Sequence, residues 1–248
     1  MLDWRALLAG GPRLLDVACG SGRFPTALVE HAGLDGLDPV RYDLLDPSAF
    51  SLGEAASHLL PPFSERDRFE TTLEDLPAGA GPWDVVWATH ALYALEPAHL
   101  APAMTRFRGA VAPGGFAFLA QGASTSFYLR VYAAFLDGVR GGAGTQYLAS
   151  DDLIAELRAQ GADPQVRRIA YDHVVAAADA AVLEGYLQRC LFDHTLSLDE
   201  ILDAPVLGAY VRSHRDHGDD VFRFRQEVDC VILASDTTPV TWQRGDAP

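Results

Sequence analysis

Residues 14–24 read LLDVACGSGRF, a short apolar run that ends in a glycine-rich turn. The residues from Arg13 to Val17 predict a buried strand, and the segment from about Pro25 to Ala32 has helical composition. A glycine turn between a strand and a helix brings backbone N–H groups close to a bound ligand. The dinucleotide fingerprint GxGxxG needs a third glycine where this chain has Pro25, so a nicotinamide enzyme is a distant alternative.

The same alternation of strand and helix continues along the chain. The sequence predicts further strands at 42–45, 68–73, 83–88, 116–120, 165–175 and 222–234, and helices at 49–60, 97–111 and 153–160. This pattern predicts an α/β, Rossmann-like fold with a seven-stranded, mostly parallel sheet and helices on both faces. We expect a single domain, residues 1–248, with a core at about 12–175 and 221–235, a helical lid inserted at about 176–220 before the last strand, and a mobile tail at 236–248.

The composition is that of a globular chain with a strongly acidic surface. Its 248 residues include 34 acidic and 19 basic side chains, for a formal net charge of −15, and every basic one is arginine. Such a surface disfavours nucleic acid as a partner, and the lack of lysine excludes Schiff-base chemistry. The three widely spaced cysteines form neither a disulfide framework nor a zinc site, and no apolar run approaches 18 residues. We expect a cytoplasmic protein with no membrane partner.

Two carboxylates accompany the first two predicted strands. Asp16 stands just before the glycine turn, and Asp46 ends the second strand. A carboxylate at the first place can meet a cationic amino-acid end, the glycines admit a nucleoside, and Asp46 would accept both ribose hydroxyls. S-adenosylmethionine carries these groups, so we expect it as the cofactor, with S-adenosylhomocysteine as its product and no metal. Asp38 is a rival for the ribose, but the strand and the following helix fit Asp46 better.

With these residues the sequence resembles a known family, the class I S-adenosylmethionine-dependent methyltransferases. LLDVACGSGRF is similar to the first family motif, YDLLDPS to the second, FETTLEDLP to the third, WDVVWATHAL to the fourth and AVAPGGFAFLA to the turn before strand five. Ala18 stands where the family usually has glycine. Thr72 stands where many members carry the aspartate that meets the adenine amine, so its hydroxyl or the Leu73 backbone would serve instead. The resemblance implies a cofactor site of Asp16, Ala18, Gly20, Ser21, Gly22, Asp46, Pro47, Ser48, Thr72, Leu73 and Thr89.

A closer likeness concerns the second half of the chain. The run from WATHALYAL through GASTSF and QYLASDDL to the last strand resembles the histamine N-methyltransferase-like branch. This resemblance implies that His90 faces the methyl acceptor, that aromatic residues line its pocket, and that Gln226 or Arg225 contacts it. The implied acceptor-binding residues are His90, Tyr93, Phe127, Tyr128 and Gln226.

Methyl transfer from a sulfonium is an in-line displacement that depends mainly on alignment, although a base helps an acceptor that must lose a proton. His90 follows the fourth strand, at the sheet edge where open α/β folds bind ligands. Our hypothesis is that His90 orients or deprotonates the acceptor with Tyr93 beside it, which makes both candidate catalytic residues. Alternatively, His90 only hydrogen-bonds the cofactor carboxylate or a neighbouring loop.

The sequence therefore predicts an enzyme, an S-adenosylmethionine-dependent methyltransferase (EC 2.1.1 class) that acts on nitrogen or oxygen of a small molecule. The alternative is a non-catalytic or rearrangement-directing cofactor-binding protein on the same fold. The acceptor and the oligomeric state are not legible from the sequence.

Several other residues have structural interpretations. His214 and His217 could ligate a metal from one helix face, but a solvated helix end is the better interpretation. Trp83 and Trp87 are expected in the core, and Cys19 is expected to pack rather than react. An aromatic stripe is expected either in the core or in the pocket wall: Phe127, Tyr128, Tyr132 and Phe135.

Overall fold

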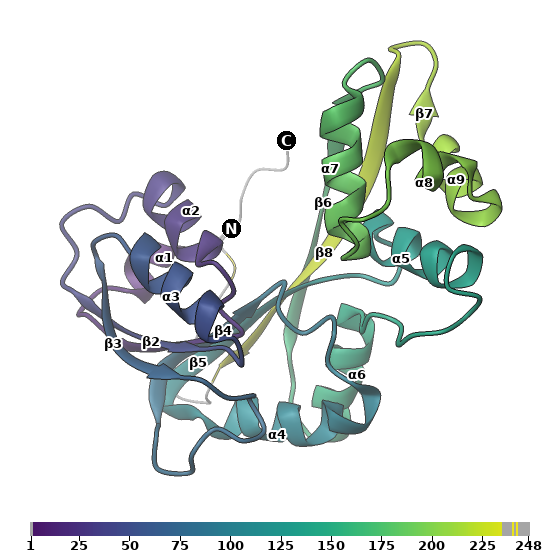
Figure 1. Cartoon of the computed structure of the whole chain (residues 1–248). Helices are drawn as coiled ribbons and strands as arrows, with labels where there is room; N and C mark the ends of the chain where they lie inside the picture. The colour runs from purple at the N-terminus through teal and green to yellow at the C-terminus, as the bar shows by residue number, and fades with distance from the viewer. Residues whose placement is uncertain (1, 235–239, 241, 243–248) are drawn as a thin grey trace.

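A central sheet organises the chain in the computed structural model, which describes residues 2–234, Val240 and Trp242 (Figure 1). The strands of the described residues are β1 (Arg13–Val17), β2 (Val40–Leu45), β3 (Phe63–Phe69), β4 (Trp83–Thr89), β5 (Val111–Gly122), β6 (Gln165–Ala176), β7 (Arg215–Asp216) and β8 (Val221–Ala234). They lie in the order β3-β2-β1-β4-β5-β8-β6, and β7 pairs with β8. The pairs from β3 to β5 are parallel, whereas β8 is antiparallel to β5, β6 and β7. The predicted mostly parallel sheet is confirmed.

Two strand predictions need correction. The sheet has eight strands and not seven, because the two-residue β7 is too short to produce a sequence pattern. The third strand was expected at 68–73 but runs from Phe63 to Phe69. Its sequence FSERDRF lies at an edge of the sheet and is mostly exposed, so it lacks the apolar alternation of a half-buried strand.

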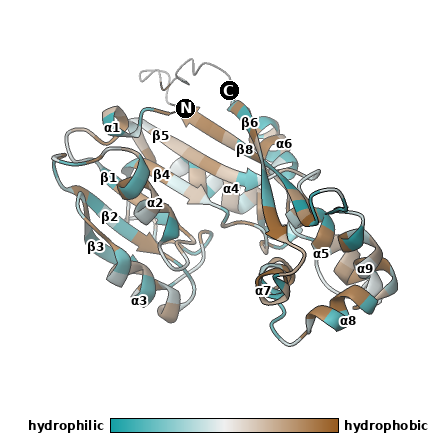
Figure 2. Ribbon diagram, turned by 90° about the horizontal axis from the view of Figure 1, so that it is seen from above, coloured by the Kyte–Doolittle hydropathy of each residue, from teal (hydrophilic) through white to brown (hydrophobic). Residues whose placement is uncertain are grey.

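Helices cover both faces of the sheet (Figures 1 and 2). On one side lie α1 (Trp4–Leu7), α2 (Arg23–His31) and α3 (Ala49–His58), and on the other lie α4 (Leu100–Gly109) and α6 (Ser150–Ala159). A short 3-10 turn, Pro97–His99, leads into α4. None of the described helices is long and apolar enough to span a bilayer.

Neighbouring residues of the central strands belong to two hydrophobic clusters on opposite faces of the sheet. Leu14 packs with α2 and α3, and Leu15 packs with α4 and α6; both are fully buried. Trp83 and Trp87 are also buried, which confirms their predicted place in the core. The sheet is therefore covered on both faces, as a parallel sheet requires.

The long strands β6 and β8 extend past the rest of the sheet and support a third hydrophobic cluster (Figure 1). This cluster joins them to α5 (Phe127–Gly138), α7 (Ala180–Leu191), α8 (Leu198–Asp203) and α9 (Pro205–Arg212). Three of these helices come from the segment between β6 and β8, where the sequence predicts a lid. Phe224 of β8 lies at the centre of the cluster and is fully buried.

The predicted mobile tail, 236–248, falls outside the described residues except at Val240 and Trp242. Val240 is 2% exposed, and Trp242 packs against the same cluster as α1 and α2.

Candidate functional site

The glycine turn lies at the carboxyl end of β1 and contains three residues with positive φ. Ala18 has φ +51°, in the left-handed region that favours glycine. This conformation explains why the family that the sequence resembles usually has glycine at this position. At Gly20 (φ +52°) no protein atom lies within 4 Å of the position that a Cβ would take, so this part of the turn is open to a ligand. At Gly22 (φ +74°) a Cβ would lie 3.0 Å from the Cα of Ala55, so Gly22 allows close packing of α2 on α3.

Asp16 and Asp46 flank this turn in the folded chain. Asp16 is 2% exposed and accepts a hydrogen bond from the Tyr42 hydroxyl at 2.6 Å. Burial, opposed by that hydrogen bond, raises the pKa of Asp16 to about 7. Asp46 accepts through Oδ2 from the Gly20 N–H at 3.1 Å and through Oδ1 from the Ser48 N–H at 2.9 Å. A carboxylate oxygen can accept two hydrogen bonds, so each Asp46 oxygen keeps one site for a ligand.

The rival acid is on the wrong edge of the sheet. Asp38 precedes β2, so it lies toward the amino end of that strand, whereas Asp46 follows its carboxyl end. Of these two acids, Asp46 is therefore the one at the ligand-binding edge of the sheet.

The remaining predicted cofactor residues also lie near the carboxyl ends of β1 to β4. Ser48 caps α3 by accepting from the Ser51 N–H, and the Ser21 carbonyl lies 3.0 Å from Nδ1 of His58. Leu73 is buried, and the Thr72 hydroxyl donates to Oδ2 of Asp75 at 3.3 Å. The sequence analysis did not name Asp75. Its position three residues after Thr72 was the signal that could have indicated it. Pro47 lies two residues past the end of β2, and Thr89 is the last residue of β4.

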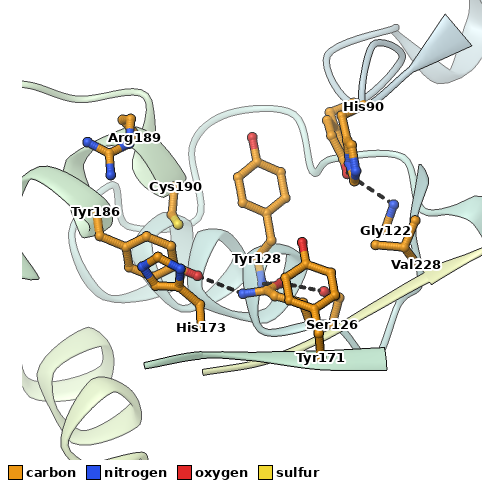
Figure 3. Close-up of a pocket in the computed structure, with 12 residues that line it drawn as sticks. His90, Gly122, Ser126, Tyr128, Tyr171, His173, Tyr186, Arg189, Cys190 and Val228 are labelled. Carbon is orange, nitrogen blue, oxygen red and sulfur yellow. Dashed lines mark hydrogen bonds between the residues drawn. The ribbon is translucent and has the colours of Figure 1, made fainter. Parts of the chain in front are cut away.

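A cavity of about 330 Å³ opens beside this edge, between the sheet and α7 (Figure 3). It is lined by His90, Tyr93, Gly122, Ser126, Tyr128, Tyr171, His173, Tyr186, Arg189, Cys190, Gln226 and Val228. Four of the five predicted acceptor residues are among them. Tyr171, His173, Tyr186 and Arg189 were missed, because they come from β6 and α7 and carry no motif. The alternation of Tyr171 and His173 on one strand face was the available signal.

His90 and Tyr93 form a hydrogen-bonded pair at one end of this cavity. His90 Nδ1 lies 2.6 Å from the Tyr93 hydroxyl, which also accepts from the Gly122 N–H at 3.0 Å. His90 has φ +53°, an uncommon conformation for a non-glycine residue, and its N–H donates to the Ala120 carbonyl at 2.7 Å. Its imidazole borders the cavity and is reached by solvent there, yet desolvation by the surrounding protein lowers its pKa below 6.5. This desolvation favours the neutral form of the ring.

Gln226 holds the floor of the cavity in place. Its Oε1 accepts from the Ser126 hydroxyl at 2.7 Å and its Nε2 donates to the Tyr186 hydroxyl at 2.6 Å. Arg225, the alternative residue, pairs instead with Asp172 at 3.4 Å and does not line the cavity.

Phe127 was predicted to bind the acceptor but lies in the core. It is 1% exposed and packs on Phe224 at 4.2 Å between ring centroids. The aromatic stripe on α5 therefore divides: Phe127 and Phe135 are buried, Tyr128 faces the cavity, and Tyr132 stacks on Tyr147 at 3.6 Å.

A second cavity of about 320 Å³ adjoins the first on the α1 side of the sheet. It is mainly apolar, with Trp4, Phe24, Phe118 and Ile169 in its wall. Three residues line both cavities: His90, Tyr171 and Val228. Thr89 also lines the second one.

His214 and Cys19 lie outside the cavities and pack against hydrophobic residues. His214 packs edge-on against Phe127 at 4.9 Å, and its Nδ1 lies 2.9 Å from the Tyr210 carbonyl. Within the described part of the chain, no three His, Cys, Asp or Glu side chains come together as a metal site would need. Cys19 packs against the cluster on the α2 face, and burial raises the pKa of its thiol.

One stretch of the chain matches a known protein family model. Residues 15–117 match a family model described as "Methyltransferase domain". This stretch of the chain is similar to a methyltransferase domain. The matched residues run from β1 into β5 and contain every predicted cofactor residue. Most of the cavity lining follows residue 117 and so lies outside the matched residues.

Solved structures show the same fold over nearly the whole chain. The protein BH2331 of Bacillus halodurans is 14% identical and aligns over 94% of this chain and 96% of its own, with a TM-score of 0.61. YcgJ of Bacillus subtilis is 13% identical over 92% and 93%, with a TM-score of 0.56. The cyclopropane synthase MmaA2 of Mycobacterium tuberculosis is 16% identical over 94% and 82%, with a TM-score of 0.52. No curated protein sequence matches the chain. The mixed α/β, Rossmann-like methyltransferase fold thus extends beyond the matched domain.

Proposed function

We propose that this protein is an S-adenosylmethionine-dependent methyltransferase that methylates nitrogen or oxygen of a small molecule bound in the cavity of His90. One observation carries the proposal. The glycine turn, Asp46 and the cavity gather at one edge of the sheet, and His90, directly after β4, belongs to that edge and to the cavity. Ligands of open α/β sheets bind at this edge.

The residues present fit the cofactor. The space above Gly20 is open, and Asp46 keeps acceptor sites for two ribose hydroxyls. Asp16 would face the cationic amino-acid end, and Thr72 with Asp75 would face the adenine amine. When bound, S-adenosylmethionine supplies an electrophilic methyl group on a sulfonium.

His90 and Tyr93 prepare the acceptor. The Tyr93 hydroxyl oxygen has two lone pairs, and the Gly122 N–H uses one of them, so the Nδ1–H of His90 can donate to the other. In that tautomer the Nε2 of neutral His90 is free to take a proton from the methyl acceptor. Burial raises the pKa of Tyr93, so its hydroxyl stays protonated and holds the imidazole in orientation. The walls from β6 and α7 border the space in which the acceptor would lie.

The wider assignment follows from surface charge and the second-half motifs. A net charge of −15 supports a small acceptor rather than a nucleic acid, and we propose a cytoplasmic enzyme. The likeness to the histamine N-methyltransferase-like branch rests on the runs WATHALYAL, GASTSF and QYLASDDL, and it is supported by three implied acceptor residues that line one cavity: His90, Tyr93 and Gln226.

Calorimetric titration tests the cofactor assignment. We expect micromolar binding of S-adenosylhomocysteine and no binding of NAD. Asp46→Ala is expected to lose about 1–3 kcal/mol of binding free energy, because a charged hydrogen-bond acceptor is removed. Asp163→Ala is the matched control, since this exposed loop acid lines neither cavity. Absence of S-adenosylhomocysteine binding, or equal affinity in the two variants, would show the proposal to be wrong.

A further inference from the structure

The cavity of His90 contains no carboxylate, although the chain is strongly acidic. Of its 34 acidic residues, none is among the twelve residues that line the cavity. The lining carries one permanent charge, the guanidinium of Arg189 on α7. The electrostatic character of this cavity is therefore opposite in sign to that of the whole chain.

Arg189 has no ionic partner within the part of the chain that the structure describes. Its charge acts on the cavity, because it contributes, after desolvation, to lowering the pKa of His173. Figure 3 shows Arg189 beside Tyr186 on the side of the cavity away from His90. An arginine fork in such a place matches the geometry of a carboxylate.

Between these two ends the cavity wall is aromatic. Tyr128 and Tyr171 lie between His90 and Arg189 in Figure 3, and both line the cavity. Tyr186 stacks on His173 with ring centroids 4.0 Å apart and planes 13° apart, and Gln226 fixes its hydroxyl. These fixed ring faces suit a flat apolar body.

We propose that the methyl acceptor is a small aromatic carboxylate, with its anionic group at Arg189, its ring among the tyrosines and its hydroxyl or amino nucleophile at His90. This inference rests on the proposed function for the reaction but not for the binding. The volume of about 330 Å³ limits the ligand to a small molecule.

Three phenols of similar size and different charge test the inference: 4-hydroxybenzoate, 4-hydroxybenzamide and 4-hydroxybenzylamine. Ligand-observed NMR titration at millimolar concentration measures their dissociation constants with and without saturating S-adenosylhomocysteine. We expect the carboxylate to bind about fivefold to tenfold more tightly than the neutral amide, and the amine to bind most weakly. Arg189→Gln should abolish this preference, and Arg189→Glu should reverse it in favour of the amine.

Arg158→Gln is the matched control, because Arg158 is exposed on α6 and lines neither cavity. Equal affinity for the three probes, absence of binding by all three, or a preference that survives Arg189→Gln would overturn the inference. The proposed function is tested separately by the S-adenosylhomocysteine titration. A charge preference at Arg189 without binding of S-adenosylhomocysteine would keep the anion site and remove methyl transfer.

Discussion

At the scale of single residues, the strained His90 is the feature most directly tied to chemistry. A left-handed backbone outside glycine costs roughly 1–2 kcal/mol and persists where the surrounding structure holds it. Here the hydrogen bonds of the backbone N–H to Ala120 and of the ring to Tyr93 hold it. The motif predicted the position of His90 in the sequence, but its backbone conformation and its pairing with Tyr93 depend on contacts with β5.

Replacement of His90 tests its role as a base. Asparagine tolerates the left-handed conformation, so His90→Asn is expected to fold normally and bind S-adenosylhomocysteine as well as the parent protein. Turnover should fall about 10²-fold or more, since a positioned base contributes at least that much. The pH–rate profile of the parent should rise to a plateau with a pKa below 6.5, because only neutral His90 accepts a proton. An unchanged rate and profile in the variant would leave His90 with no part in the chemistry.

Asp16 predicts a pH dependence of cofactor binding. With a pKa of about 7 in the free protein, Asp16 is mostly protonated at pH 6 and ionised at pH 8. A cationic ligand group requires the carboxylate, so S-adenosylhomocysteine should bind about tenfold more weakly at pH 6 than at pH 8. Calorimetry at both pH values measures this ratio, and Asp16→Asn should reduce it to about one.

The same shift affects folding stability. The folded state keeps a proton on Asp16 between about pH 4 and pH 7, whereas the unfolded chain, with an ordinary pKa of 3.8, has lost it. Because the folded state binds more protons in this window, the contribution of Asp16 to the free energy of unfolding falls as pH rises. Urea unfolding at pH 5 and pH 8 measures the free energy of unfolding. Asp16→Asn should remove the part of the difference between these two values that Asp16 contributes.

At the scale of secondary-structure elements, Asp43 joins four strands at the amino edge of the sheet. It is fully buried on β2 and accepts from Arg13 of β1 at 2.9 Å, from the indole N–H of Trp83 of β4 at 2.6 Å and from the Asp67 N–H of β3 at 3.1 Å. Since its partners come from three other strands, loss of this carboxylate would leave buried polar groups on all of them unpaired.

Removal of this carboxylate leaves Arg13 without its buried partner. Asp43→Ala is expected to lower the free energy of unfolding by about 3–5 kcal/mol. Asp67→Ala serves as the control, since its side chain is half-exposed and 4.0 Å from Arg13, and should cost below about 1 kcal/mol. Urea unfolding of both variants gives the comparison, and similar losses for the two would refute the central role of Asp43.

The elements themselves differ in how well the sequence predicts them. β1, β4 and β8 are apolar and bounded by turn residues, so pattern alone places them within a residue or two. β3 is charged and lies at an edge, and α1 has four residues, so neither has a periodic pattern long enough to detect. The proposed cofactor residues follow strand ends, so the sequence pattern can indicate where they lie. The acceptor side combines α5, β6 and α7, whose proximity arises only from packing in the third cluster.

At the scale of the whole molecule, β6 and β8 connect two bodies of structure. One part of each strand lies in the sheet beside β5, and the other part extends past the sheet and packs against α5 and α7 to α9 (Figure 1). The cavity lies where the two bodies meet. Residues within the family match, 15–117, form its His90 end, and later residues form its Arg189 end. Most of the cavity lining therefore lies outside the residues that match the family model, and under the proposed function this part would select the acceptor.

The position of His90 between two cavities also bears on regiochemistry. A ligand confined to the tyrosine-lined cavity presents a terminal atom to the imidazole. A longer ligand that also fills the apolar cavity, past Trp4 and Phe118, presents an atom from its middle. The length of a molecule, and not only its charge, would therefore determine which of its atoms becomes methylated.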